Sequence, residues 1–571
     1  MRPPRRFAVL WRAFFAQFFT SDHVGADIQL RQTIIGVLAF LLVPGIILLV
    51  QIFFDYQGIV ARTLAHRRDA DLDGTLEWIV FVFTTYSAVT VGFVAVFVWD
   101  ALVFDQRDAM VLGPLPLRGT TLVSAKLSAL AAFLVGTALL VNLPNAFMFA
   151  FETANSLALS ALFLHFFGFL AATVLMAVFV FTALVSIRGV LPLLFGARTA
   201  AACGSLLQFV FVVALLTFVI LCPAVWRVPH RALVNPTVTG WLPPSWFVGV
   251  FERVRGSTVA YFMPQATRAF VATSIAVASA IVVSIAAFRR QMQLTLAPAA
   301  GVRGAAAVRA VRWIARRLVG ADPAAAAAAD FILVTMARSR AQQTPIAMNA
   351  AIGVAMVVAS LVQLRDPGTP AHPASALLSI PLMLAFWAVV GFRAACFVPA
   401  DAPASWTFRV NAPDMARSGW LAVRASMIAL IVPPIVVAAA LLALILDWRL
   451  ALWHVAVTTG LTVALIEIAA PTIRFLPFTR PYVHGHARLR TRWPMYLFGM
   501  FVFSRAPAHT DVLLTHPAAL ATVCTALTIA IGALELAGRC RPRAWPPQSD
   551  DDDVNPDVFR IKVLDLGYGV D

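Results

Sequence analysis

The feature that most constrains this chain is a series of apolar runs separated by arginine-rich segments. A run of about 20 apolar residues is long enough for a helix to cross a bilayer, where backbone polar groups must hydrogen-bond within their own segment. A transmembrane barrel would instead need alternating strands of about ten residues. The predicted helical runs lie at about 33–54, 76–99, 122–144, 157–186, 203–225, 266–288, 345–364, 376–398, 419–446, 451–473, 494–504 and 511–537.

Composition supports the same conclusion. Of the 571 residues, 60% are hydrophobic and 13% are charged, whereas soluble domains average about 45–50% apolar and about 25% charged. A soluble domain has too few polar groups to cover so much apolar surface, and a disordered chain has the opposite balance. The predicted fold class is an all-α polytopic membrane protein with about 12 transmembrane helices.

The basic residues predict the orientation of these helices. The chain has 44 Lys and Arg against 28 Asp and Glu, a formal net charge of +16. With a cytoplasmic amino end and twelve spans, roughly three-quarters of the basic residues fall on the cytoplasmic side, as the positive-inside rule requires. Both ends are then cytoplasmic, although Arg62, Arg67 and Arg68 oppose the bias locally. This distribution accounts for the basic charge without nucleic acid as a partner.

The amino-terminal segment is predicted to be a helix in the membrane surface. Apolar residues recur at helical spacing from Phe7 to Phe18, but Arg12 and Gln17 interrupt them, and no small-residue cleavage site follows. A poorly ordered basic leader is the alternative. Lys126 and Lys562 are the only lysines, an arginine-rich usage that favours a GC-rich genome. The expected location is a bacterial inner (plasma) membrane.

The chain also repeats itself, with six runs, a basic linker and six more runs. Both halves begin with an amphipathic stretch, at 5–19 and 329–340, and both carry a Leu-Pro after their fourth run. Because six is even, the two halves would be parallel repeats. The predicted domains are an interfacial helix at 1–31, a first six-span bundle at 32–290, a basic cytoplasmic linker at 291–329, a second six-span bundle at 330–538 and a cytoplasmic tail at 539–571.

The most informative segment follows the second run, at 99–127. Its sequence, WDALVFDQRDAMVLGPLPLRGTTLVSAKL, places acidic and basic residues beside a proline-punctuated apolar turn. A loop that only crossed back would be short and polar, whereas exposed apolar residues on a rigid turn are what a docking surface needs. The segment predicts contact with a cytoplasmic protein.

This pattern resembles the membrane subunits of ATP-binding-cassette exporters of the ABC-2 permease type. The resemblance rests on D-x-R-D followed by L-x-P-L-P and Lys126, on the six-span unit with a leading interfacial helix, and on LPPSWF at 242–247. It implies that the loop couples to an ATPase, and that the second loop, at 397–414, is its counterpart although it lacks the L-x-P-L-P core. The implied coupling residues are Asp105, Arg107, Asp108, Leu112, Pro114, Leu115, Pro116, Asp401, Trp406 and Arg409.

The energy source is expected to lie on another subunit. A phosphate-binding loop of the form G-x-x-x-x-G-K-[ST] needs a lysine after glycine, but Lys126 follows Ala125 and Lys562 follows Ile561. The expected function is therefore the permease component of an ATP-driven exporter that is not itself an enzyme. Its expected partners are a nucleotide-binding ATPase subunit and membrane lipid. Two bundles in one chain would let it work as a pseudo-dimeric permease.

Two other functions stay open. An ion-coupled secondary transporter with two six-helix bundles is one, although its usual G-x-x-x-D-R-x-G-R-R loop does not match residues 104–117. A membrane enzyme is the other, and its one candidate cluster is His66 with Asp69, Asp71 and Asp73, in what looks like a hydrophilic loop. Lipids, peptides and drugs all stay open as substrates.

Three polar residues inside the runs are costly to bury and are therefore of interest. Glu467 is expected to pair with Arg474 or with an arginine of a neighbouring helix, with a proton site as the alternative. His165 and His454 are expected to hydrogen-bond between helices. Neither the five cysteines nor His484 and His486 form a ligand set, so no metal or cofactor is expected.

Overall fold

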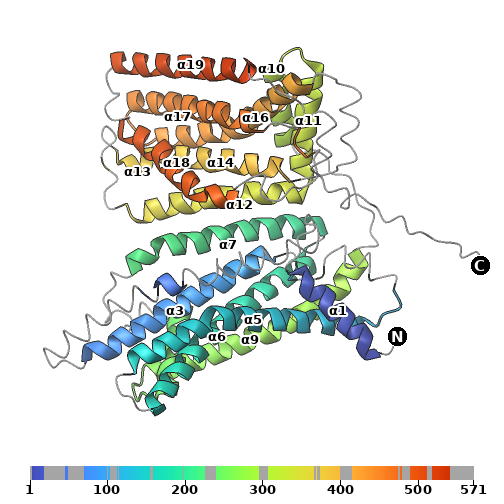
Figure 1. Cartoon of the computed structure of the whole chain (residues 1–571), viewed down its shortest axis with the longest axis vertical. Helices are drawn as coiled ribbons and strands as arrows, with labels where there is room; N and C mark the ends of the chain where they lie inside the picture. Colours follow the sequence, from blue (N-terminus) through green and yellow to red (C-terminus); the bar gives the residue numbers. More distant parts are fainter. Residues whose placement is uncertain are drawn as a thin grey trace, which may run out of the picture. The chain divides into compact units, whose positions relative to one another are not determined.

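In the computed structural model, the chain divides into two compact units, Met1–Ala299 and Ala300–Asp571 (Figure 1). The boundary falls inside the predicted linker at 291–329. The structure describes residues 3–18, 45–48, 50, 70–99, 101–102, 104, 112, 115–154, 159–195, 197–225, 240–294, 306–364, 368, 373–398, 415–473, 476–478, 489–510 and 517–540.

Across these described ranges the regular structure is helical, and the one β-type pairing is an isolated bridge between Gly368 and Pro373. Nine helices in the described part of the chain are long and apolar enough to cross a membrane. The prediction of a helical, multi-pass membrane protein is thereby confirmed. The candidate spans are Asp73–Phe97, Gly119–Thr153, Leu159–Leu194, Phe262–Phe288, Gln342–Val362, Ser375–Cys396, Arg417–Ala443, Trp448–Thr472 and Ala521–Arg539.

Three predicted runs have no counterpart among these spans. The run at 33–54 lies mostly outside the described residues. The runs at 203–225 and 494–504 contain shorter apolar helices, Cys203–Phe218 and Met495–Arg505. The second of these was also the shortest run in the sequence.

In the first unit, the long helix α6 (Leu159–Leu194) is the centre of the packing. It contacts α3 (Ala70–Phe97), α5 (Gly119–Thr153), α7 (Ala197–Val225), α8 (Pro243–Arg255) and α9 (Phe262–Leu294). The amino-terminal helix α1 (Pro3–Gln17) packs against α5. The 36 residues of α6 rise about 54 Å, whereas the hydrocarbon core is about 30 Å thick. This helix is therefore longer than an untilted crossing of the hydrocarbon core requires.

The second unit begins with two helices that precede its first span, α10 (Ala306–Val319) and α11 (Pro323–Arg338). Both pack against α16 (Met415–Ala443), and they lie at one end of the unit in Figure 1. The other helices are α12 (Arg340–Val362), α13 (Ser375–Leu378), α14 (Ile380–Cys396), α17 (Trp448–Ala469), α18 (Leu489–Thr510) and α19 (Pro517–Cys540).

Two helices begin earlier than their sequence patterns predicted. The amphipathic stretch predicted at 329–340 starts at Pro323, because Asp322 caps the helix through the backbone N–H groups of Ala324 and Ala325 and proline suits the first turn. Helix α3 starts at Ala70 rather than at residue 76. Asp71 and Asp73 therefore belong to a helix and not to a loop. Acidic residues near the start of a helix are favoured by the positive end of its dipole.

Prolines occur inside several long helices. Pro144 lies in α5 and Pro192 in α6, whereas α16 carries the adjacent pair Pro433 and Pro434. Each proline removes a backbone hydrogen bond, which helices packed against neighbours in a membrane tolerate.

Candidate functional site

Most of the predicted coupling residues lie outside the described residues. These are Asp105, Arg107, Asp108, Pro114, Asp401, Trp406 and Arg409. The described part of the first loop contains the expected turn, because the Leu115 N–H donates to the Leu112 carbonyl at 3.2 Å. Leu115 is 48% exposed and Pro116 is exposed, while Leu112 is half-buried. An apolar residue is thus presented outward on a turn.

The start of the same loop is buried in the first unit. Trp99, Leu102 and Phe104 are all buried, and the Leu102 N–H donates to the Val98 carbonyl at 3.2 Å. The Phe104 ring meets Phe288 of α9 with ring centroids 4.7 Å apart, and Phe14 of α1 at 5.7 Å. The loop after α3 is therefore anchored to two other helices.

Lys126 of α5 completes this anchor, although it is only 2% exposed. Its Nζ donates to Gln17 Oε1 at 2.8 Å, and it lies 4.8 Å from the ring centroid of Phe14 and 5.7 Å from that of Phe104. Cation–π contacts of this kind strengthen when water is excluded. We call Lys126, Gln17, Phe14, Phe104 and Phe288 the Lys126 cage. It links α1, α5, α9 and the loop after α3.

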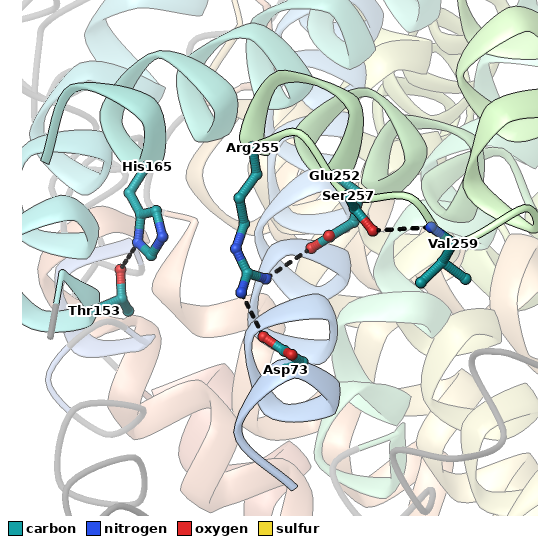
Figure 2. Close-up of polar contacts among 7 residues, drawn as sticks. All are labelled: Asp73, Thr153, His165, Glu252, Arg255, Ser257 and Val259. Atoms are coloured by element: carbon teal, nitrogen blue, oxygen red, sulfur yellow. Dashed lines mark hydrogen bonds and ion pairs between the residues drawn. The ribbon is translucent and has the colours of Figure 1, made fainter. Parts of the chain in front are cut away.

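The opposite end of the first unit carries a charged network (Figure 2). Arg255, the last residue of α8, pairs with Asp73 of α3 and with Glu252 Oε1 at 3.3 Å. In the segment that follows, the Val259 N–H donates to Ser257 Oγ at 3.4 Å. The network ties the start of α3 to the end of α8.

The electrostatics of this network are unbalanced. Burial raises the pKa of the Glu252 carboxyl, and the Asp73 charge adds to that effect while Arg255 opposes it. Glu77, on α3, is also buried and lies close enough to Glu252 and Asp73 to interact with both charges. Among the described residues, the Arg255 guanidinium is the cation that interacts with all three carboxyls.

His165 lies near this end of the unit, six residues into α6. Thr153 of α5 donates its hydroxyl proton to the Phe149 carbonyl at 2.7 Å, so its oxygen is left to accept from His165 Nδ1 at 2.8 Å (Figure 2). The histidine rests against the rings of Phe149 and Phe251. This is the hydrogen bond between helices that its sequence position predicted.

The LPPSWF segment forms the N-cap and start of α8, and its aromatic residues and the preceding Trp241 differ in exposure. Trp241 is 83% exposed, whereas Phe247 is fully buried in the first unit's core. Trp246 is between these extremes and donates its indole N–H to the Gly240 carbonyl at 2.9 Å. Only Trp241 has the exposure expected of an interfacial anchor.

In the second unit, Glu467 of α17 is buried and pairs with Arg424 of α16, with Nε and Oε1 2.5 Å apart. This is one of the two kinds of partner expected for it, and Arg474 lies outside the described residues. Arg424 also contacts Glu535 of α19 at 3.4 Å, and Glu535 pairs with Arg539 at 2.5 Å. Three helices are thereby joined by charge.

Sequence reasoning missed several of these functional side chains. Gln17 was seen only as an interruption of an apolar stretch, and Glu252 and Arg255 were passed over. These two residues are three apart in FERVR at 251–255, and that spacing was a usable signal for an ion pair. Within the described ranges, no group of three His, Cys, Asp or Glu residues is arranged to hold a metal ion.

No family model, curated protein or solved structure matches this chain.

Proposed function

We propose that this chain is the permease component of an ATP-driven exporter of the ABC-2 type, with ATP hydrolysis on a separate nucleotide-binding subunit in the cytoplasm of a bacterium. The observation that carries the proposal is the Lys126 cage. It anchors the start of the expected coupling loop to α1, α5 and α9 at once. A push on the exposed turn at Leu115 would therefore reach helices that run the length of the unit.

The paired packing of the helices supports a twofold repeat. Six of the contacts between helices in the first unit have a counterpart between helices in the same chain order in the second unit. The corresponding pairs are α1–α5 and α11–α16, α3–α5 and α14–α16, α3–α6 and α14–α17, α3–α7 and α14–α18, α5–α6 and α16–α17, and α6–α9 and α17–α19. Each unit would then supply one bundle of the translocation pathway.

The proposed orientation places the Lys126 cage in the cytoplasmic half of the protein. The distribution of arginines favours this side, and both chain ends would share it. The network of Asp73, Glu252 and Arg255 would then lie on the outer side. ATP-driven closure of the partner subunits would act on the loop, and α3 would carry the movement to this network.

Site-specific crosslinking from the exposed turn tests this proposal. A photo-crosslinker on Leu115→Cys in native cells should capture a nucleotide-binding subunit, identified by mass spectrometry through its phosphate-binding loop. The matched control is Val259→Cys, which is similarly exposed at the opposite end of the unit. Capture of no ATPase from residue 115, or equal capture from residue 259, would contradict the proposal.

A second experiment separates docking from transmission. Phe104→Ala removes the loop's anchor, whereas Phe97→Ala removes an exposed ring from the same region of chain. We expect Phe104→Ala to keep the ATPase bound while transport falls, with Phe97→Ala close to wild type. Ion-driven uptake by membrane vesicles lacking ATP would instead favour a secondary transporter.

A further inference from the structure

Helix α10 has an outward face on which a large aromatic ring and several arginines are exposed. Its inward face is apolar, with Ala315 and Val319 buried against the unit's core. Its outward face carries Trp313, which is 61% exposed. Arg309 and Arg317 are exposed on the same face, whereas the exposed Arg316 pairs with Asp330 of α11.

The contacts of α10 fix its level along the unit. Arg312 donates Nε and Nη2 to the two oxygens of Asp330 on α11, both at 2.9 Å. Asp322, between α10 and α11, accepts from Ser418 Oγ at 2.7 Å. Ser418 is in the first turn of the candidate span Arg417–Ala443. Helix α10 is therefore held where a span enters the membrane.

The side chains on the outward face suit that level. Trp313 has a large apolar ring, and the Arg317 guanidinium stacks on it with its carbon 5.4 Å from the ring centroid. Tryptophan favours the headgroup region of a bilayer, and arginine forms paired hydrogen bonds with phosphate. The segment AAVRAVRWIARRLV has four arginines and no acidic residue, and Asp330 of α11 pairs with two of them, Arg312 and Arg316. A net positive charge is left, which is complementary to an anionic leaflet.

We propose that the outward face of α10, formed by Trp313 with Arg309 and Arg317, binds the headgroup phosphates of anionic phospholipids. The lipids belong to the leaflet in which the span Arg417–Ala443 begins. The indole enters the headgroup region while the guanidinium groups contact the phosphates. The inference uses the second unit alone and is independent of whether the chain transports anything.

Fluorescence quenching of the full chain in lipid nanodiscs tests the proposal. Wild type and Trp313→Phe are compared in discs in which brominated phosphatidylglycerol or brominated phosphatidylcholine is the quencher at equal mole fraction. The difference between the two proteins isolates Trp313 from the other tryptophans. We expect brominated phosphatidylglycerol to quench Trp313 several-fold more than brominated phosphatidylcholine does. Each arginine removed should lower this ratio by about fivefold.

The variant Arg309→Gln/Arg317→Gln should therefore quench almost equally with both lipids. Arg253→Gln, which removes an exposed arginine from α8 in the first unit, should leave the preference unchanged. Equal melting temperatures would confirm that each variant is folded. Equal quenching of wild-type Trp313 by both lipids, or its quenching by aqueous iodide instead of by lipid, would overturn the proposal and favour a protein or solvent-facing role for this face.

Discussion

The ion pairs of the two units differ in how deeply they are buried. In the first unit the ion pairs join α3 and α8 at one end, and Asp73 in that network is 61% exposed as a side chain. In the second unit Glu467 is fully buried and Arg424 joins it to a third helix. Ion pairs thus hold one end of the first bundle, whereas in the second bundle they also reach the interior.

The basic residues near the start of α5 and of α16 show the same contrast. Lys126 is surrounded by an amide oxygen and aromatic rings, whereas Arg424 contacts two carboxylates. Removing a partner from a buried ion pair is expensive because the remaining charge keeps its desolvation cost. The second unit should therefore depend more on its buried charges than the first does.

The largest expected effect follows directly. Glu467→Leu leaves Arg424 without its closest partner and should lower the free energy of unfolding by about 3–5 kcal/mol. Arg424→Met/Glu467→Leu replaces the pair by apolar groups and should recover most of that loss, since Glu535 keeps Arg539. Thermal unfolding in detergent measures both. A double variant that is no more stable than the single one would contradict the inference that an unpaired buried charge causes the loss.

The first unit should be more sensitive to close helix packing. A Cβ added at Gly249 of α8 would lie 2.7 Å from the Ala266 nitrogen and 2.8 Å from the Phe262 oxygen, both in the backbone of α9. Gly249→Val should therefore destabilise the fold by about 1–3 kcal/mol. Gly136→Val is the matched control, because nothing lies within 4 Å of its Cβ position. Similar melting temperatures for the two variants would refute close packing as the cause.

A smaller effect should depend on pH. Because burial raises the pKa of Glu252 in the folded chain, the folded state binds a proton more readily than the unfolded state. The free energy of unfolding should then fall as pH rises from the ordinary value of 4.5 through the folded pKa. Glu252→Gln should gain stability relative to wild type over that window. Thermal melts at a series of pH values measure this gain. A gain that shrinks as pH rises would contradict the raised pKa of Glu252.

The smallest expected effect concerns a partly exposed pair. Burial alone would raise the pKa of Asp330, but hydrogen bonds from Arg312 and Arg316 hold it below its ordinary 3.8. The stabilisation is present above pH 3.8 and is lost as pH falls through the folded pKa. Asp330→Asn should lower the free energy of unfolding by about 1 kcal/mol or less at neutral pH. Below pH 3.8 the melting temperatures of the variant and of wild type should converge. A gap that widens in acid would count against this pair.

The helices were predictable because the hydrocarbon environment leaves a long apolar run almost no other structure. Their ends were less so, since the start of α3 at Ala70 and of α11 at Pro323 depends on acidic residues that also suit loops. The ion pair of Glu467 was predictable in kind, because a buried carboxylate needs a partner. That Arg424 is the partner depends on which helices are neighbours, and a single sequence does not contain that information.

The Lys126 cage was out of reach for the same reason. Phe14 and Gln17 are neighbours on one helix, but Phe104, Lys126 and Phe288 are far from them in the sequence, at no regular spacing. The exposed turn at Leu115 was predicted because proline and glycine punctuate it locally. Local structure was therefore predictable from the sequence, whereas contacts between distant segments were not.

The adjacent prolines of α16 have a mechanical consequence. Pro433 and Pro434 leave the carbonyls of Ala429 and Leu430 without their usual helical donors, so the bending stiffness of α16 is lowest near its midpoint. The half that contains Ser418 and Arg424 is clamped by α11 and Glu467. Any flexing of α16 would therefore swing its other half, with residue 433 as the pivot.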